Sequence, residues 1–106
     1  MTTVVVYKNN TGLTGFSVSG HAGYDEEGYD IVCASASVLI TTCANALETV
    51  VKVIPEVNVS EAHIEVKLPK KMTDVEKNNA RIVLATTLQG FKDIATSYPD
   101  YFTLKQ

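Results

Sequence analysis

The first twenty residues carry the pattern of two short β-strands joined by a turn. Residues 2–8 hold three valines, two threonines and a tyrosine, which are the β-branched and aromatic types that favour strands. Residues 9–12 read Asn-Asn-Thr-Gly, a run of turn formers. Residues 13–20 then alternate the large apolar Phe16 and Val18 with small polar neighbours, as a half-buried strand does. This pattern predicts a β-hairpin.

The chain between Gly20 and Asp30 has neither a helical nor a strand period. It contains three acidic residues, two tyrosines and two glycines. We expect a loop here. Asp30 is expected to cap a helix that runs through residues 31–53 and ends before Pro55. Apolar residues three and four apart predict one buried face, made of Val32, Ala36, Leu39, Cys43, Leu47 and Val50. This helix is long enough for a membrane span, but the polar Asn45, Glu48 and Lys52 interrupt it, so we interpret it as a core helix.

The second half repeats this order of elements. Residues 57–59 and 63–68 predict a second hairpin around a turn at residues 60–62. Thr73 and Glu76 have the spacing of a capping box, which predicts the start of a second helix. Pro99 ends this helix, whose predicted buried face is Ala80, Leu84, Leu88, Phe91, Ala95 and Tyr98. The pattern predicts an α+β fold, in which two hairpins form an antiparallel or mixed sheet packed against two long helices.

Composition narrows the class of protein. The 106 residues are 45% apolar and 20% charged, which fits a single small domain spanning residues 1–106 and excludes disorder. Nine basic and twelve acidic side chains give a net charge of −3, the wrong sign for contacts with phosphates, so we expect no direct nucleic-acid partner and no membrane partner. Cys33 and Cys43 predict neither a disulfide framework nor a metal site. With no leader pattern at the N-terminus, we expect a cytoplasmic protein without cofactors.

Two side chains are candidates for chemistry. Cys33 is expected about one turn inside the first helix, where free N–H groups and the helix dipole favour a thiolate. His21 stands at the other end of the same loop, next to Gly20, and a cysteine with a nearby histidine is the minimum for a thiol nucleophile with its base. In the alternative interpretation, Cys33 is a small buried hydrophobe and His21 a structural histidine. Cys43, ten residues deeper in the helix, is expected to be structural.

The neighbouring residues each have two interpretations. Asp30 either caps the helix or orients His21. Ser37, one turn beyond Cys33, either donates a hydrogen bond into the site or bonds back to its own helix. Tyr24 and Tyr29 either pack on aromatic side chains of a substrate or anchor the loop on the core. His63 has no evident partner in the sequence, and we expect a surface histidine.

These residues resemble a known family. Gly20-His21-Ala22, a short glycine-bearing loop, and Asp30-Ile31-Val32-Cys33-Ala34 with Ser37 are similar to the ribosomal-processing cysteine proteases called Prp. The resemblance covers essentially the whole chain. It implies that Cys33 is the nucleophile and His21 the base, and that Gly20, Asp30 and Ser37 are the supporting positions. Ser35 departs from the pattern, because a small apolar residue is expected there.

The resemblance also implies a substrate and an assembly. Members of the family remove a short N-terminal extension from the twenty-seventh protein of the large ribosomal subunit, cleave after a paired aromatic segment and form homodimers. The loop between the histidine and the cysteine is expected to order around the peptide. Two other functions remain open from the residues: a non-catalytic binding module associated with the ribosome, and a thiol-based redox or transferase enzyme, which the lack of a resolving cysteine disfavours.

Overall fold

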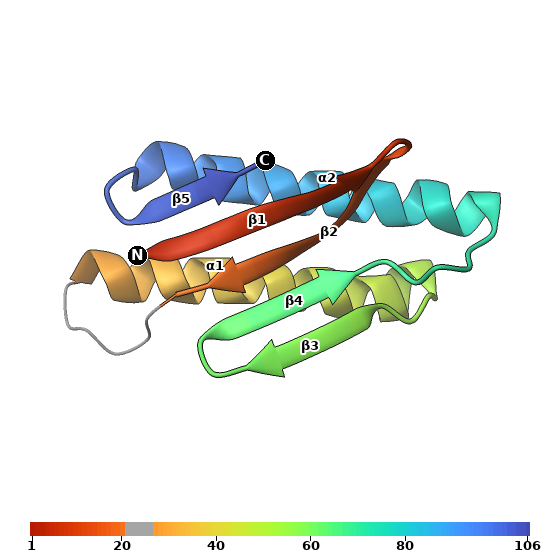
Figure 1. Ribbon diagram of the computed structural model, residues 1–106, viewed down its shortest axis with the longest axis horizontal. Helices are drawn as coiled ribbons and strands as arrows, with labels where there is room; N and C mark the ends of the chain where they lie inside the picture. The colour runs from red at the N-terminus through yellow and green to blue at the C-terminus, as the bar shows by residue number, and fades with distance from the viewer. Residues whose placement is uncertain (21–26) are drawn as a thin grey trace.

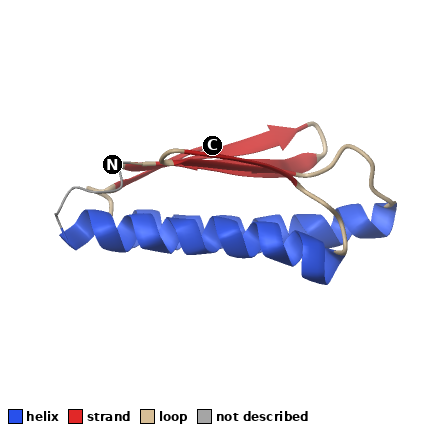
Figure 2. Cartoon of the chain, turned by 90° about the horizontal axis from the view of Figure 1, so that it is seen from below, coloured by secondary structure: helices blue, strands red, loops and turns tan. Residues whose placement is uncertain are grey.

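The chain folds into one five-stranded sheet with two helices on one of its faces (Figures 1 and 2). The computed structural model describes residues 1–20 and 27–106. The strands are β1 (Thr2–Asn9), β2 (Gly12–Ser19), β3 (Glu56–Ser60), β4 (His63–Lys67) and β5 (Phe102–Lys105). The helices are α1 (Glu27–Ala46), which continues into a π-helical turn η1 (Leu47–Val51), and α2 (Asp74–Ser97). The predicted α+β class is confirmed.

Both predicted hairpins are present and pair with each other. β1 pairs antiparallel with β2, and β3 pairs antiparallel with β4. β2 also pairs antiparallel with β4, which joins the two hairpins into one sheet of order β3-β4-β2-β1-β5. Ala62, in the turn between β3 and β4, has a left-handed φ of 56°. The sheet therefore has two edges, β3 and β5.

The pattern did not predict β5, which makes the sheet mixed. It pairs parallel with β1, from Thr2 opposite Phe102 to Val5 opposite Lys105. Its Phe102 stacks on Phe91 of α2 at 6.4 Å between ring centroids, and Phe91 meets the edge of Phe16 of β2 at 5.3 Å. These three buried rings fix the C-terminal strand to the core beneath the sheet.

The second helix begins and ends as predicted, but its predicted buried face is only partly confirmed. Ala80, Leu84 and Phe91 are buried, whereas Leu88, Ala95 and Tyr98 are only partly buried and the unpredicted Thr87 and Ile94 are buried. Thr73 accepts a hydrogen bond from the backbone N–H of Glu76, and the Glu76 carboxylate accepts one from the backbone N–H of Thr73. This capping box satisfies two N–H groups that the first turn leaves free. The helix ends at Ser97, two residues before Pro99.

The first helix departs from the prediction at both ends. It begins at Glu27, so Asp30 is its fourth residue, and the predicted N-cap at Asp30 is wrong. The helix also ends in the π turn, whose wider i→i+5 hydrogen bonding aligns Val51 with Leu47 in the core. Val50 is therefore 72% exposed, against the prediction, and the unpredicted Ile40 is fully buried.

One face of the first helix belongs to the core, as expected. The stretch Ile31–Val51 is long and apolar enough to cross a membrane by length and composition. Its side chains that pack against the sheet or α2 are buried: Val32, Ala36, Ile40, Cys43, Leu47 and Val51. This packing is that of a core helix in a two-layer domain.

The sheet is wider than the helical layer. Helix α1 contacts β1, β2 and β4, and α2 contacts β2 and β5. Every residue of β3 is exposed, including Val57 and Val59, which pair with the core-facing Val66 and Ile64 of β4. In Figure 1, β3 lies at the margin of the sheet, beyond most of α1. This strand therefore overhangs the helices, with its inward valines uncovered.

Candidate active site

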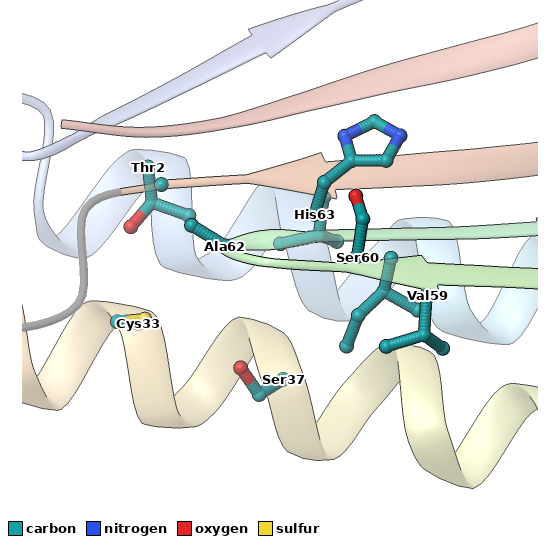
Figure 3. A pocket seen from close by; sticks show the side chains of 10 residues that line it. Thr2, Cys33, Ser37, Val59, Ser60, Ala62 and His63 are labelled. Atoms are coloured by element: carbon teal, nitrogen blue, oxygen red, sulfur yellow. The ribbon is translucent and has the colours of Figure 1, made fainter.

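A cavity of about 200 Å³ lies between the first turns of α1 and one end of the sheet (Figure 3). Its walls come from α1, the start of β1, the end of β2 and the β3–β4 turn. We call it the Cys33 pocket, and it is lined by Thr2, Val18, Gly20, Cys33, Ser37, Val59, Ser60, Ala62, His63 and Ile64. The pocket brings together three predicted site residues, Gly20, Cys33 and Ser37, which the sequence spreads over eighteen positions.

The two cysteines differ in access. Cys33 is partly exposed and lines the pocket, whereas Cys43 is 1% exposed and lies in the core. Burial raises the pKa of the Cys43 thiol, and a hydrogen bond with Thr87 opposes this only in part. A buried thiol of this kind is inert. The structural role predicted for Cys43 is therefore confirmed.

The position of Cys33 in its helix differs from the expected one. Because α1 begins at Glu27, Cys33 is its seventh residue, nearly two turns from the start. The effect of the helix dipole falls off within the first turn. The helix dipole therefore does not favour a thiolate at Cys33. The assignment of Cys33 as nucleophile rests instead on its access to the pocket.

Ser37 is directed into the pocket. Figure 3 shows its hydroxyl oxygen turned toward the sheet from the same side of α1 as Cys33. Nearby Ser35 instead donates to the carbonyl oxygen of Ile31 at 2.7 Å, a bond back to its own helix. Within the described part of the chain, Ser37 makes no such bond, so its hydroxyl is available to a group in the pocket.

Gly20 allows a close approach between two strands at the pocket wall. A side chain here would place Cβ 3.1 Å from Thr2 Oγ1 and 3.3 Å from Thr2 Cα, tighter than ordinary contact. The backbone N–H of Gly20 also donates to the carbonyl oxygen of Ala62 at 3.0 Å. Gly20 therefore holds the end of β2 against both β1 and the β3–β4 turn.

His63 is not the isolated surface histidine that the sequence predicts. It is partly buried, and its Nδ1 lies 2.7 Å from Ser19 Oγ. Alternate residues of β4 face opposite sides of the sheet, and Val66 and Ile64 face the helices. Figure 3 accordingly shows the His63 ring turned away from α1 and from Cys33. The residue lines the pocket, but its imidazole points to the other face of the sheet.

The remaining predicted residues lie at or beyond the start of α1. His21 and Tyr24 lie outside the described residues. Tyr29 and Asp30 belong to the first turn of α1, not to a loop and a cap, so that part of the prediction is wrong. The sequence reasoning missed Thr2, Ser60 and Ala62, because only strand pairing brings them to the pocket. The sequence predicted the hairpin turn that carries Ser60 and Ala62. It did not predict that this turn and the start of β1 lie against α1.

A metal centre has no support in this region. Within the described residues, no group of three histidine, cysteine or acidic side chains lies close enough to hold a metal ion. Apart from His63, whose ring turns to the other face of the sheet, the side chains that line the pocket with Cys33 are hydroxyls and aliphatic groups. They suit a thiol that acts on a bound organic substrate.

Comparison with known proteins agrees with this geometry. The model of a family described as cysteine protease Prp matches residues 1–103. A Staphylococcus aureus protein named ribosomal processing cysteine protease Prp is 29% identical over 107 residues, which cover 98% of this chain and 97% of that protein. A Bacillus subtilis protein of the same name is 21% identical over 94 residues, which cover 87% of this chain and 84% of that protein.

Solved structures share the fold. The crystal structure of the ribosomal processing protease Prp from S. aureus with a substrate peptide has a TM-score of 0.85 at 28% identity, over 99% of this chain and 98% of that one. A Streptococcus mutans protein has a TM-score of 0.87 at 26% identity, over 99% and 92% of the two chains. Together with the family match over nearly all of its length, these findings identify the chain as a cysteine protease that belongs to the Prp family.

Proposed function

We propose that this protease removes a short N-terminal extension from the twenty-seventh protein of the large ribosomal subunit, with Cys33 as nucleophile and His21 as base. The names of its relatives support ribosomal processing. The observation that carries the site assignment is the difference between the two cysteines. A cysteine protease needs an accessible thiol, and Cys33 lines a pocket while Cys43 lies in the core.

The choice of base follows from the position of His63 in the fold and from the place of His21 in the sequence. The His63 ring faces away from α1 and bonds to Ser19. His21 directly follows Gly20, which lines the Cys33 pocket, and consecutive Cα atoms are about 3.8 Å apart. His21 is therefore the histidine that we propose as the partner of the Cys33 thiol.

The proposed reaction proceeds through a thioester. The His21 imidazole takes the proton from Cys33 Sγ, and the sulfur attacks the peptide carbonyl carbon to form a tetrahedral intermediate. The intermediate collapses as the C–N bond breaks, and protonated His21 gives its proton to the leaving amine. His21 then takes a proton from water, whose oxygen attacks the thioester carbonyl carbon. The C–S bond breaks as protonated His21 returns its proton to the Cys33 sulfur, and the new carboxylic acid loses its proton to solvent.

The supporting residues have separate roles in this proposal. The Ser37 hydroxyl, open to the pocket, donates a hydrogen bond to the substrate or the intermediate. Gly20 fixes the end of β2 at the wall of the pocket. Asp30, in the first turn of α1, orients His21. Tyr24 and Tyr29, on either side of the α1 start, pack against aromatic side chains of the substrate.

We also propose that the enzyme acts in the cytoplasm as a homodimer. Ile31 and Val38 of α1 lie seven residues apart on one helical face and are 50% and 65% exposed. Exposed aliphatic side chains on one face of a helix suit contact with a second copy. Sedimentation equilibrium of the wild type and of a Val38→Asp variant tests this, since a monomeric wild type would contradict it.

Peptide cleavage tests the dyad directly. A peptide that spans the junction between the extension and the mature protein is incubated with each variant. The product masses are then measured by mass spectrometry. Cys33→Ala is expected to abolish cleavage, and His21→Ala to lower kcat at least about a hundredfold. The matched controls are Cys43→Ala and His63→Gln, which should stay within about tenfold of wild type. Cleavage that survives in Cys33→Ala would contradict the assignment of the nucleophile, whereas a wild type that binds the peptide without cleaving it would favour the binding module.

A further inference from the structure

The wall of the Cys33 pocket contains a polar side chain that is almost completely buried. Thr2, the first residue of β1, is 2% exposed and lines the pocket. Alternate residues of β1 are buried, from Thr2 through Val4 to Val6, so Thr2 lies on the face of the sheet that the helices cover. Figure 3 shows its hydroxyl oxygen on the side of the sheet where α1 carries Cys33. The sheet wall of the pocket therefore presents a hydroxyl across from the helix that holds the thiol.

The Thr2 hydroxyl has no partner within the described part of the chain. No hydrogen bond there reaches its oxygen, whereas every described side-chain oxygen or nitrogen that is fully cut off from solvent has a partner. The Thr2 oxygen is therefore open to the pocket. A buried hydroxyl normally has a hydrogen-bond partner, because an unpaired one has lost its bonds to water. The partner that completes this hydroxyl enters from the pocket.

The backbone around Thr2 holds the hydroxyl in place. The Thr2 N–H donates to the Tyr101 carbonyl oxygen at 3.1 Å, and Thr2 pairs with Phe102 in the parallel ladder between β1 and β5. On the other side Gly20 leaves room, since a Cβ at that position would lie 3.1 Å from Thr2 Oγ1. A β-branched side chain also has few χ1 rotamers. The donor is therefore positioned before a substrate binds.

The other hydroxyls of the pocket are less shielded than that of Thr2. Ser37 of α1 is half-buried, and Ser60 at the end of β3 is exposed. Water competes for an exposed donor and screens its attraction to a negative charge, whereas a buried donor acts at a lower effective dielectric constant. Thr2 is therefore the hydroxyl that would stabilise a negative charge in this pocket most strongly.

We propose that the Thr2 hydroxyl donates a hydrogen bond to the carbonyl oxygen of the scissile bond when that oxygen becomes negatively charged. This inference rests on the proposed function, in which Cys33 is the nucleophile. When the Cys33 sulfur bonds to the carbonyl carbon, one electron pair of the C=O double bond moves to the oxygen. A donor that is already in place stabilises this charge more than it stabilises the neutral carbonyl. Thr2 is then a further catalytic residue, supplied by β1.

Two adjacent threonines of β1 provide a matched test. Thr3 lies on the opposite face of the sheet and does not line the Cys33 pocket. The substrate is the peptide that spans the junction between the extension and the mature protein, called the junction peptide below. Thr2→Val should lower kcat about a hundredfold, the lower end of the loss from one oxyanion donor, with KM within about threefold. Thr3→Val should keep kcat within about twofold, because it removes a hydroxyl from the other face.

Two further variants show whether the hydroxyl itself is responsible. Thr2→Ser keeps a hydroxyl and should retain kcat within about fivefold of wild type, whereas Thr2→Ala lacks one and should repeat the loss seen in Thr2→Val. Valine favours strands and has nearly the volume of threonine, so Thr2→Val should unfold in urea at the wild-type midpoint or above it. Wild-type kcat in Thr2→Val, or equal losses in Thr2→Val and Thr2→Ser, overturns the proposal.

The pH dependence separates a direct role from one through the nucleophile or its base. A donor to the oxyanion leaves the titration of these two groups unchanged, so the profile of kcat/KM against pH should keep its shape in Thr2→Val while its height falls. A profile displaced along the pH axis would show that Thr2 acts through the nucleophile or the base. That result overturns the proposal.

Two small reagents test the donor without a ribosomal substrate. With p-nitrophenyl acetate, the Cys33 sulfur loses its proton to solvent and bonds to the carbonyl carbon, and the C–O bond then breaks to release p-nitrophenolate. This acylation passes through an oxyanion, whereas alkylation by iodoacetamide displaces iodide and forms none. In Cys43→Ala protein, Cys33 is the one cysteine left. There Thr2→Val should slow acylation at least about tenfold and leave alkylation within about twofold.

These reactions also distinguish failure of the donor from failure of the proposed function. Slower acylation with unchanged alkylation supports Thr2 as the donor even if the wild type does not cleave the junction peptide, a result that would contradict only the proposed function. Equal slowing of both reactions would show that Thr2 affects the thiol itself, and it overturns the donor. Unchanged acylation, with wild-type cleavage of the junction peptide intact, overturns the donor and leaves the proposed function standing.

Discussion

Ser19 and His63 are directly opposed on β2 and β4, and a contact of 2.7 Å joins Ser19 Oγ to His63 Nδ1 on the face of the sheet turned away from α1. The bond ties the end of β2, from which the chain leaves toward His21, to the hairpin that walls the pocket. It lies across the sheet from the Cys33 thiol. Its role is therefore structural.

Loss of this bond should lower stability more than activity. Ser19→Ala is expected to reduce the free energy of unfolding by about 0.5–1.5 kcal/mol, the usual contribution of one partly buried hydrogen bond. Because Ser19 does not line the Cys33 pocket, kcat should stay within about threefold of wild type. Urea unfolding and peptide cleavage measure the two effects. A hundredfold fall in kcat with unchanged stability would instead give the Ser19–His63 pair a part in catalysis.

The two thiols should differ in reactivity. In native protein near pH 7.5, iodoacetamide is expected to modify Cys33 and to spare Cys43, because burial excludes the reagent and raises the pKa of the Cys43 thiol. Peptide mapping by mass spectrometry locates the label. In 6 M guanidinium chloride both cysteines should react, which serves as the control. Equal labelling of Cys43 in the native protein would mean that the helix layer opens readily.

The acid stability of the sheet should depend on Tyr7 and Glu65. The Tyr7 hydroxyl donates to Glu65 Oε2 at 2.9 Å, and this bond, with a weaker one from Asn58, lowers the pKa of the Glu65 carboxyl in the folded state. A carboxyl with a lowered folded pKa stabilises the protein above its unfolded pKa of about 4.3, and the effect is lost as the pH falls through the folded value.

Tyr7→Phe tests this linkage. The variant should be less stable than wild type at pH 7, and the difference in free energy of unfolding should shrink at pH 3. NMR titration should show a higher Glu65 pKa in the variant. Tyr98→Phe, which leaves Glu65 untouched, is the control. A difference that grows toward acid pH would contradict the assignment of the Tyr7 bond to the ionised carboxylate.

The capping box of α2 offers a local measure of stability. Thr73→Ala removes the oxygen that accepts from the Glu76 backbone N–H and should cost about 1 kcal/mol. Thr86→Ala, in the middle of the same helix, removes only a bond to the Ile82 carbonyl and introduces a better helix former. It should be neutral or slightly stabilising. Equal losses in the two variants, measured by urea unfolding, would show that the cap contributes nothing.

Local sequence determined most of the elements. The two hairpins and α2 follow from short-range patterns: period-two alternation, turn residues between strands, and the Thr73–Glu76 capping box. Each involves residues a few positions apart, so the sequence is sufficient to predict them. The same holds for Cys33 as a candidate, because a cysteine and serine one turn apart share a helical face whatever the rest of the fold does.

Tertiary structure decided the site. Parallel pairing of β5 with β1 joins segments about a hundred residues apart, and no local period specifies it. The sheet register turned the His63 ring away from Cys33, and the two-helix layer left β3 uncovered beside the pocket. The sequence alone thus predicted four of the five strands, both helices and the candidate thiol. Only long-range strand pairing and the packing of two helices beneath five strands decided which of them meet around Cys33.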